Sequence, residues 1–186
     1  PLETIKKICG ALLEKLKLKF TIPGLLFIDT PGHAAFTNLR KRGGNLADIS
    51  VLVIAVNEGF KPQTLECIEI LKTYKIPFII AATKIDLIEG WQTKEMPITQ
   101  SISSQAQKTQ QLFETKMYEI VGKLYESGFE AERFDRVNDY KKQISLVPVS
   151  SKTGEGVQEL LMVITGLTQR FLEKNLEIDE KTAAKG

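Results

Sequence analysis

The stretch ISVLVIAV, residues 49–56, is the longest strongly apolar run in the chain. Its apolar residues are continuous, as expected of a β-strand that is covered on both faces. Similar short runs lie at residues 25–28, 77–82 and 144–149. Between the later runs, and after the last one, apolar residues recur at the three- and four-residue spacing of a helix face. The three patterns are Leu65, Ile68 and Leu71; Phe113, Met117, Ile120, Val121 and Leu124; and Val157, Leu160, Leu161, Ile164, Leu167 and Phe171. This alternation predicts an α/β fold, in which helices flank a mostly parallel sheet.

Three further segments complete the predicted organisation. Residues 2–16 have the spacing of one helix face. The alternating stretch KLKLKFTI, residues 15–22, and the apolar run at residues 25–28 form an expected strand pair joined at Pro23-Gly24. The connection at about residues 91–142 is longer than a crossover needs, but it lacks the several apolar segments of a second core. We therefore expect one domain over residues 1–186, with an elaborated connection and, from about residue 175, a charged tail leading toward a following domain.

The composition narrows the possible functions. With 42% hydrophobic residues, the 186-residue chain can bury one sizeable core. The 25 basic residues nearly balance the 23 acidic ones, so the total charge indicates neither a nucleic-acid nor a membrane partner, and any such contact must be local. No apolar run approaches the roughly 20 residues of a membrane span, and we expect no signal peptide. Cys9 and Cys67 lie in helical patterns, typical of small buried side chains in a reducing compartment, and one histidine offers too few ligands for zinc.

Polar clusters follow three of the four apolar runs. Asp29 follows the first run, the sequence Thr83-Lys84-Ile85-Asp86 follows the third, and Ser150-Ser151-Lys152 follows the fourth. Because the carboxyl ends of parallel strands meet at one edge of a sheet, we expect these clusters to converge there. Ligands of open parallel sheets bind at that edge, so the sequence predicts a binding site built from the three clusters.

The motifs DTPGH (residues 29–33), TKID (residues 83–86) and SSKTGEG (residues 150–156) resemble the third, fourth and fifth motifs of translational GTPases. The segments LRKRGGNLADIS, NEGFKPQT and GFEAERFDRV resemble the GTP-binding domain of the archaeal and eukaryotic initiation factor five B family, a relative of bacterial initiation factor two. The resemblance implies a P-loop (Ras-like) GTPase fold that binds GTP or GDP with Mg²⁺. It also implies a cytoplasmic, ribosome-dependent GTPase that promotes subunit joining and initiator tRNA placement. The partners would be ribosomal RNA and ribosomal proteins, with initiator tRNA bound through other domains and no membrane.

At the phosphate end, the resemblance assigns roles to the DTPGH motif. The Asp29 carboxylate would hold Mg²⁺ through a water molecule, as hydrated hard cations prefer. The Gly32 N–H would approach the terminal phosphate and move when that phosphate leaves, which makes the turn a switch. His33 would orient the attacking water and stabilise charge in the transition state. The alternative for this motif is a structural Asx-type loop that carries a surface histidine.

At the base end, Asp86 would accept two hydrogen bonds from the guanine N1–H and 2-amino group, each worth about 1.5–3 kcal/mol. Adenine lacks both donors, which disfavours an ATP-using protein. The stems of Lys84 and Lys152 would cover the two faces of the base, and the Ser151 N–H, beside Ser150, would point at the guanine carbonyl oxygen. Thr83 stands where the family has Asn, so part of that contact is lost. The alternative for TKID is a capped strand end with solvated charges.

The sequence contains no G-x-x-x-x-G-K-[ST] phosphate loop and no threonine of the first switch. In the family, the strand that leads into this loop lies between the strands expected at residues 25–28 and 49–56. We therefore expect a GTPase fold without its central first strand, which exposes two strand edges and leaves this chain inactive alone. The alternative is a non-hydrolysing interaction module that retains the guanine pocket. The triplet Arg40-Lys41-Arg42 is either a ribosome contact or a solvated helix face.

Overall fold

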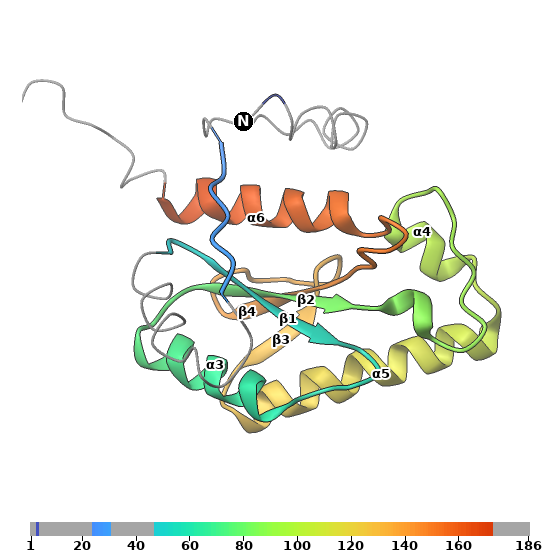
Figure 1. Cartoon of the computed structure of the whole chain (residues 1–186), viewed down its shortest axis with the longest axis horizontal. Helices are drawn as coiled ribbons and strands as arrows, with labels where there is room; N and C mark the ends of the chain where they lie inside the picture. The colour runs from blue at the N-terminus through green and yellow to red at the C-terminus, as the bar shows by residue number, and fades with distance from the viewer. Residues whose placement is uncertain (1–2, 4–23, 31–46, 173–186) are drawn as a thin grey trace, which may run out of the picture.

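The structure is a computed structural model that describes residues 3, 24–30 and 47–172 (Figure 1). Its elements follow in the order β1 (Ser50–Ala55), α3 (Pro62–Thr73), β2 (Phe78–Thr83), the short 3-10 helix η2 (Ile85–Leu87), α4 (Ile98–Ser103), α5 (Gln107–Glu126), β3 (Glu130–Arg133), β4 (Gln143–Pro148) and α6 (Val157–Leu172). The four described strands form one sheet in the order β1-β2-β4-β3. Every pairing is parallel.

The sheet is covered on both faces. Figure 1 shows α6 over one face and α3 with α5 over the other. Neighbouring side chains of the central strand β2 lie on opposite faces of the sheet. Ile80 packs in the larger core with residues of α3 and α5, and Ile79 packs with Ile164 and Leu167 of α6. Both isoleucines are fully buried. The continuous apolar sequence of β2 therefore reflects a strand with a core on each side.

The predicted α/β class is confirmed. Three of the four apolar runs form β1, β2 and β4, and three of the four predicted helix patterns form α3, α5 and α6. In α5, the buried residues lie on one stripe: Thr109, Phe113, Met117, Ile120 and Leu124. Among the described helices, none is both long and apolar enough to cross a membrane.

The first apolar run, at residues 25–28, is not a strand. Residues 24–30 have no secondary structure, and Leu26, Phe27 and Ile28 are 88%, 64% and 57% exposed. The prediction of a buried strand at residues 25–28 is therefore wrong for this structure. The physical reason is pairing. A strand needs a hydrogen-bonded neighbour, and no described strand pairs with residues 24–30, so β1 is the outermost strand on its side of the described sheet. On β1 itself, the Val53 side chain is 61% exposed.

Two elements within residues 91–142 are not predicted from the apolar pattern. They are α4 and β3, and β3 has the polar sequence Glu-Ala-Glu-Arg. Arg133 is nevertheless buried, because its guanidinium pairs with Glu114 at 2.7 Å and with Asp135 at 2.6 Å. Burial alone would raise the pKa of the Asp135 carboxyl, but the hydrogen bonds and charge of Arg133 outweigh it, and the pKa lies below its usual value.

Several predictions concern residues that the structure does not describe. The helix at residues 2–16, with Cys9, the strand that precedes Pro23 and the tail from residue 175 lie outside the described residues. Cys67 lies half-buried on α3, packed against the larger core.

Candidate functional site

The carboxyl ends of β2 and β4 lie side by side. These central strands pair in register, with Ala82 opposite Pro148. Beyond the paired residues, the Val149 N–H donates to the Ala82 carbonyl oxygen at 2.8 Å, and the Ile85 N–H donates to the Val149 carbonyl oxygen at 3.5 Å. The sheet thus delivers the TKID and SSK segments to one place, as the strand-end argument requires.

A side-chain hydrogen bond joins the two segments. The Ser150 hydroxyl donates to Oδ1 of Asp86 at 2.7 Å, although the residues are 64 positions apart in the chain. The same hydroxyl oxygen accepts the Thr153 N–H at 3.2 Å. Ser150 is fully buried and Asp86 is half-buried. The carboxylate is therefore held at the strand ends while part of it faces solvent.

Lys84 is held by its backbone and by an ion pair. It adopts the left-handed conformation, with a φ of 64°, directly before the short 3-10 helix η2. Its ammonium pairs with the Glu58 carboxylate, which also pairs with Lys61. Hydrogen bonds and positive charge from Lys61 and Lys84 lower the pKa of Glu58 from 4.5 to about 2. Glu58 thus links the loop after β1 to the loop after β2.

Thr83 contacts β1 through its side chain. Its hydroxyl donates to the Ile54 carbonyl oxygen at 3.4 Å, and its own carbonyl oxygen accepts the Val56 N–H at 3.0 Å. The residue that replaces the family's Asn therefore spends its one hydroxyl on the neighbouring strand.

The segment of residues 150–154, which we call the base loop, is a closed turn. The Gly154 N–H donates to the Ser150 carbonyl oxygen at 2.9 Å, and the Ser150 N–H donates to the Glu155 carbonyl oxygen at 2.9 Å. These bonds close the turn just before α6 begins. Ser151 and Lys152, at its tip, are exposed.

The phosphate end is described only in part. Asp29 is exposed at the end of residues 24–30, and no hydrogen bond or ion pair between described residues joins it to Asp86 or Ser150. Gly32, His33 and the basic triplet at residues 40–42 lie outside the described residues. The structure thus brings together Thr83, Lys84, Asp86, Ser150, Ser151 and Lys152, whereas no contact among the described residues links Asp29 to them.

Two glutamates of the site region are not predicted from the sequence. Glu58 holds Lys84, and Glu155 is buried directly beside the base loop. The signal for Glu155 is its position between two glycines immediately before an apolar helix, in TGEG. Three of its four side-chain contacts come from residues 54 to 64 positions away, so sequence spacing does not reveal them.

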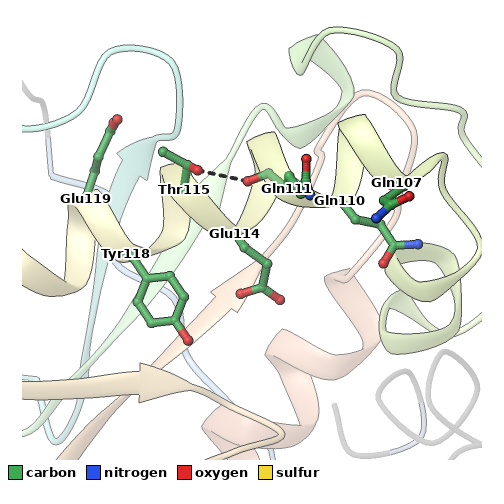
Figure 2. Close-up of a pocket in the computed structure, with 7 residues that line it drawn as sticks. All are labelled: Gln107, Gln110, Gln111, Glu114, Thr115, Tyr118 and Glu119. Carbon is green, nitrogen blue, oxygen red and sulfur yellow. Dashed lines mark hydrogen bonds between the residues drawn. The ribbon is translucent and has the colours of Figure 1, made fainter.

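A separate hollow lies along α5 (Figure 2). Its lining residues all belong to this one helix: Gln107, Gln110, Gln111, Glu114, Thr115, Tyr118 and Glu119. The dashed bond in Figure 2 is the Thr115 hydroxyl donating to the Gln111 carbonyl oxygen at 2.9 Å within the helix. None of the predicted site residues lines this hollow. Within the described ranges, no group of three or more His, Cys, Asp or Glu residues could hold a metal ion.

Comparisons with known proteins agree with this arrangement. The model of the family "Elongation factor Tu GTP binding domain" matches residues 9–170. The chain is 56% identical to a "Probable translation initiation factor IF-2" of Methanopyrus kandleri, covering 96% of this chain and 30% of that protein. It is also 56% identical to the protein of the same name from Methanobrevibacter smithii, covering all of this chain and 31% of that protein.

A solved structure, "Crystal structure of GDP-bound aIF5B from Aeropyrum pernix", matches all of this chain and 30% of that chain, with a TM-score of 0.86 and 49% identity. The chain spans about a third of the length of these relatives. The resemblance drawn from DTPGH, TKID and SSKTGEG is thereby confirmed. The chain belongs to the family of elongation factor Tu GTP-binding domains and has a P-loop GTPase fold.

Proposed function

We propose that this chain is the guanine-recognising part of a ribosome-dependent GTPase of translation initiation. The observation that carries the proposal is the hydrogen bond between Ser150 and Asp86, which unites two motifs at adjacent strand ends. The names of the relatives support the assignment to initiation, and the matching GTP-binding domain family and the GDP-bound solved structure favour a GTPase over a non-hydrolysing interaction module. In the complete protein, here called the full-length factor, GTP hydrolysis would control the joining of ribosomal subunits and the placement of initiator tRNA in the cytoplasm.

Asp86 is proposed to select guanine. An ionised carboxylate has about four lone-pair positions, so the bond from Ser150 leaves room for the guanine N1–H and 2-amino donors. Because Asp86 is half-buried, these contacts would form at the edge of the protein, where water is partly excluded. Adenine presents no donor to this carboxylate, and the uncompensated desolvation would reject it.

The two lysines are proposed to enclose the base. Glu58 holds the Lys84 ammonium to one side, which leaves the alkyl stem of Lys84 available to lie across one face of the ring. Lys152 is exposed at the tip of the base loop and would cover the other face. The backbone N–H of Ser151, next to it, would donate to the guanine carbonyl oxygen.

The phosphate end is proposed from the DTPGH motif. Asp29 is an exposed carboxylate, and a single hard oxygen ligand suits an Mg²⁺ ion that keeps most of its water molecules. Mg²⁺ would neutralise charge that develops on the phosphates. The Gly32 N–H would bind the terminal phosphate, and His33 would orient the attacking water. The 186 residues contain no phosphate loop, so hydrolysis is proposed only for the full-length factor.

Contacts with the ribosome are proposed for the basic triplet Arg40-Lys41-Arg42, in the segment that follows the phosphate switch. Guanidinium and ammonium groups suit ribosomal RNA phosphates. Initiator tRNA would be bound by other domains of the full-length factor.

The test is the substitution Asp86→Asn in the full-length factor. The Asn amide places an NH₂ donor where guanine also presents donors, so GTP affinity should fall at least about a hundredfold. Xanthine has a carbonyl at position 2, which the amide can match, so affinity for xanthosine triphosphate should rise. Equilibrium titration with fluorescent GTP and xanthosine analogues measures both changes.

Asp139→Asn is the matched control, because Asp139 lies in the loop before β4 and accepts the Lys141 N–H there. It should leave both affinities unchanged. Unaltered GTP affinity in the Asp86→Asn variant would remove the base-pocket assignment.

A further inference from the structure

We propose that Glu155 is a positioning residue for the guanine site, which fastens the base loop to the connection between η2 and α5. The inference rests on the proposed function, because it concerns how that site keeps its shape. No step of the proposal gives Glu155 a contact with the nucleotide.

The Glu155 carboxylate is buried and accepts four hydrogen bonds. It is 6% exposed. Its Oε1 accepts the Ser101 hydroxyl at 2.9 Å and the Lys94 N–H at 3.3 Å. Its Oε2 accepts the Thr153 hydroxyl at 3.0 Å and the Trp91 indole N–H at 3.2 Å. Four donors compensate the burial of a charge, and one of them, Thr153, belongs to the base loop.

Glu155 also closes the base loop through its backbone. Its carbonyl oxygen accepts the Ser150 N–H at 2.9 Å, and its own N–H donates to the Thr153 hydroxyl at 3.5 Å. Ser150 in turn donates to Asp86. One residue therefore holds the start of the loop by its backbone and the later part by its side chain, and Ser151 and Lys152 lie between these two anchors.

The other donors come from residues 91–105, which we call the platform. Gln105 is buried, and its side-chain amide accepts the Gln92 N–H at 2.8 Å and donates to the carbonyl oxygens of Gln92 at 2.8 Å and Ser101 at 3.1 Å. Trp91 packs against the fully buried Phe113 of α5, with ring centroids 5.7 Å apart. The platform is thus tied to itself and to the core, which makes it a fixed support for Glu155.

This arrangement predicts how the nucleotide responds when the carboxylate changes. Without its anchor, the base loop samples other conformations, and the Ser151 N–H and the Lys152 stem leave the positions that bind the base. Nucleotide should then dissociate faster. The affected contacts are those near the carbonyl oxygen of the base, which GDP and inosine diphosphate share. The binding of both nucleotides should therefore weaken by the same factor. Inosine lacks only the 2-amino group that Asp86 is proposed to bind.

Glu159 is the matched control. It is equally buried, at 6% exposed, and its Oε1 accepts the Ile98 N–H at 2.8 Å, at the first residue of α4. It therefore holds the same platform but makes no hydrogen bond to the base loop in the described residues. Glu159→Gln keeps an oxygen that can accept the Ile98 N–H, so it shows the effect of removing a buried carboxylate beside the platform without releasing the base loop.

The experiment measures the dissociation of mant-GDP and mant-inosine diphosphate from the full-length factor by stopped-flow displacement. Glu155→Gln keeps the side-chain volume but replaces one acceptor oxygen with a donor, so two of the four donors lose their partner. We expect dissociation of both nucleotides to accelerate about tenfold or more, with their ratio unchanged, and Glu159→Gln to change each rate less than about twofold.

A second pair of variants covers the case in which Glu155→Gln does not fold. Thr153→Val removes the hydroxyl that Glu155 binds and should accelerate dissociation of both nucleotides, while Thr153→Ser keeps the hydroxyl and should restore the rate of the unaltered protein. Equal rates for the Val and Ser variants would overturn the inference.

Other outcomes separate this inference from the proposed function. If the unaltered factor binds mant-GDP, but mant-GDP dissociates from the Glu155→Gln variant at the same rate as from the unaltered factor, the inference is wrong and the guanine site stands. If Glu159→Gln accelerates dissociation as much as Glu155→Gln, or the ratio of the two nucleotides changes, the role of Glu155 in positioning the loop is also wrong. An unaltered factor that does not bind mant-GDP would overturn the proposed function and this inference together.

Discussion

Gly156, the residue immediately before α6, offers a sharp test of how the base loop is packed. Its φ is +75°, and a Cβ added there would lie 2.0 Å from the carbonyl oxygen of Pro148 and 3.1 Å from the Cα of Val149. Both atoms belong to backbone at the carboxyl end of β4, so a side-chain rotation cannot relieve the overlap. Gly156→Ala must instead displace the strand end that carries Ser150.

Gly154 is the reference for the cost. Its φ of +82° is nearly the same, but no atom lies within 4 Å of an added Cβ. A non-glycine residue in the left-handed region costs about 1–2 kcal/mol, which both alanine variants should lose. Overlap in a packed region costs about 1–3 kcal/mol more, which only Gly156→Ala should lose. Taking central values, we expect losses of about 3.5 kcal/mol for Gly156→Ala and about 1.5 kcal/mol for Gly154→Ala.

Differential scanning calorimetry of the full-length factor measures both losses. The relevant transition is the one that moves upward when GDP is added, because ligand stabilises the domain that binds it. At about 3 °C per kcal/mol for a domain of this size, Gly156→Ala should lower that transition by about 10 °C and Gly154→Ala by about 5 °C. Equal shifts, or a larger shift for Gly154→Ala, would refute the close contact between Gly156 and β4.

The remaining predictions concern the two ends of the site. In nucleotide titrations, Asp86→Asn should change the preference of the site from guanine nucleotides to xanthine nucleotides. His33→Ala should slow ribosome-stimulated GTP hydrolysis in single-turnover assays while leaving GTP affinity within about twofold, because its proposed role begins only in the transition state; unchanged turnover would contradict that role. The pKa of Glu58 is about 2 in the folded protein, below the value of 4.5 expected in the unfolded chain. Its ion pairs with Lys61 and Lys84 should therefore contribute their full stability above about pH 4.5, and this contribution should be lost as the pH falls through 2. A carboxyl titration by NMR with a midpoint near 4.5 would contradict it.

Much of the fold follows from the sequence because the apolar runs of β1, β2 and β4 are short, continuous and separated by helical patterns. A core on each face requires such runs, as the opposite packing of Ile79 and Ile80 demonstrates. Parallel strands also bring their carboxyl ends to one edge, which is why the sequence predicts TKID and SSK at the same edge, whereas the pairing of β2 with β4 makes them neighbours. The bond between Asp86 and Ser150 agrees with that placement.

The exceptions have a common cause in interactions that are distant in sequence. Apolar character suggests a strand at residues 25–28, but those residues pair with no described strand and stay exposed. Conversely, β3 has little apolar character, yet it forms because it pairs with β4 and because Arg133 finds two carboxylates. Strand formation depends on a neighbour as well as on the strand's own residues.

The amino-acid order is therefore sufficient for the class of the fold, the succession of its main elements and the polar residues at the ends of β2 and β4. The residues that support those polar groups emerge only from the packing of the folded chain. Glu155 is a solvated charge by its chemistry alone, and it becomes a buried anchor because Trp91, Lys94, Ser101 and Thr153 direct four donors at it. Local periodicity records which face of an element is buried, whereas the compensation of a buried charge depends on groups that meet only after the chain has folded.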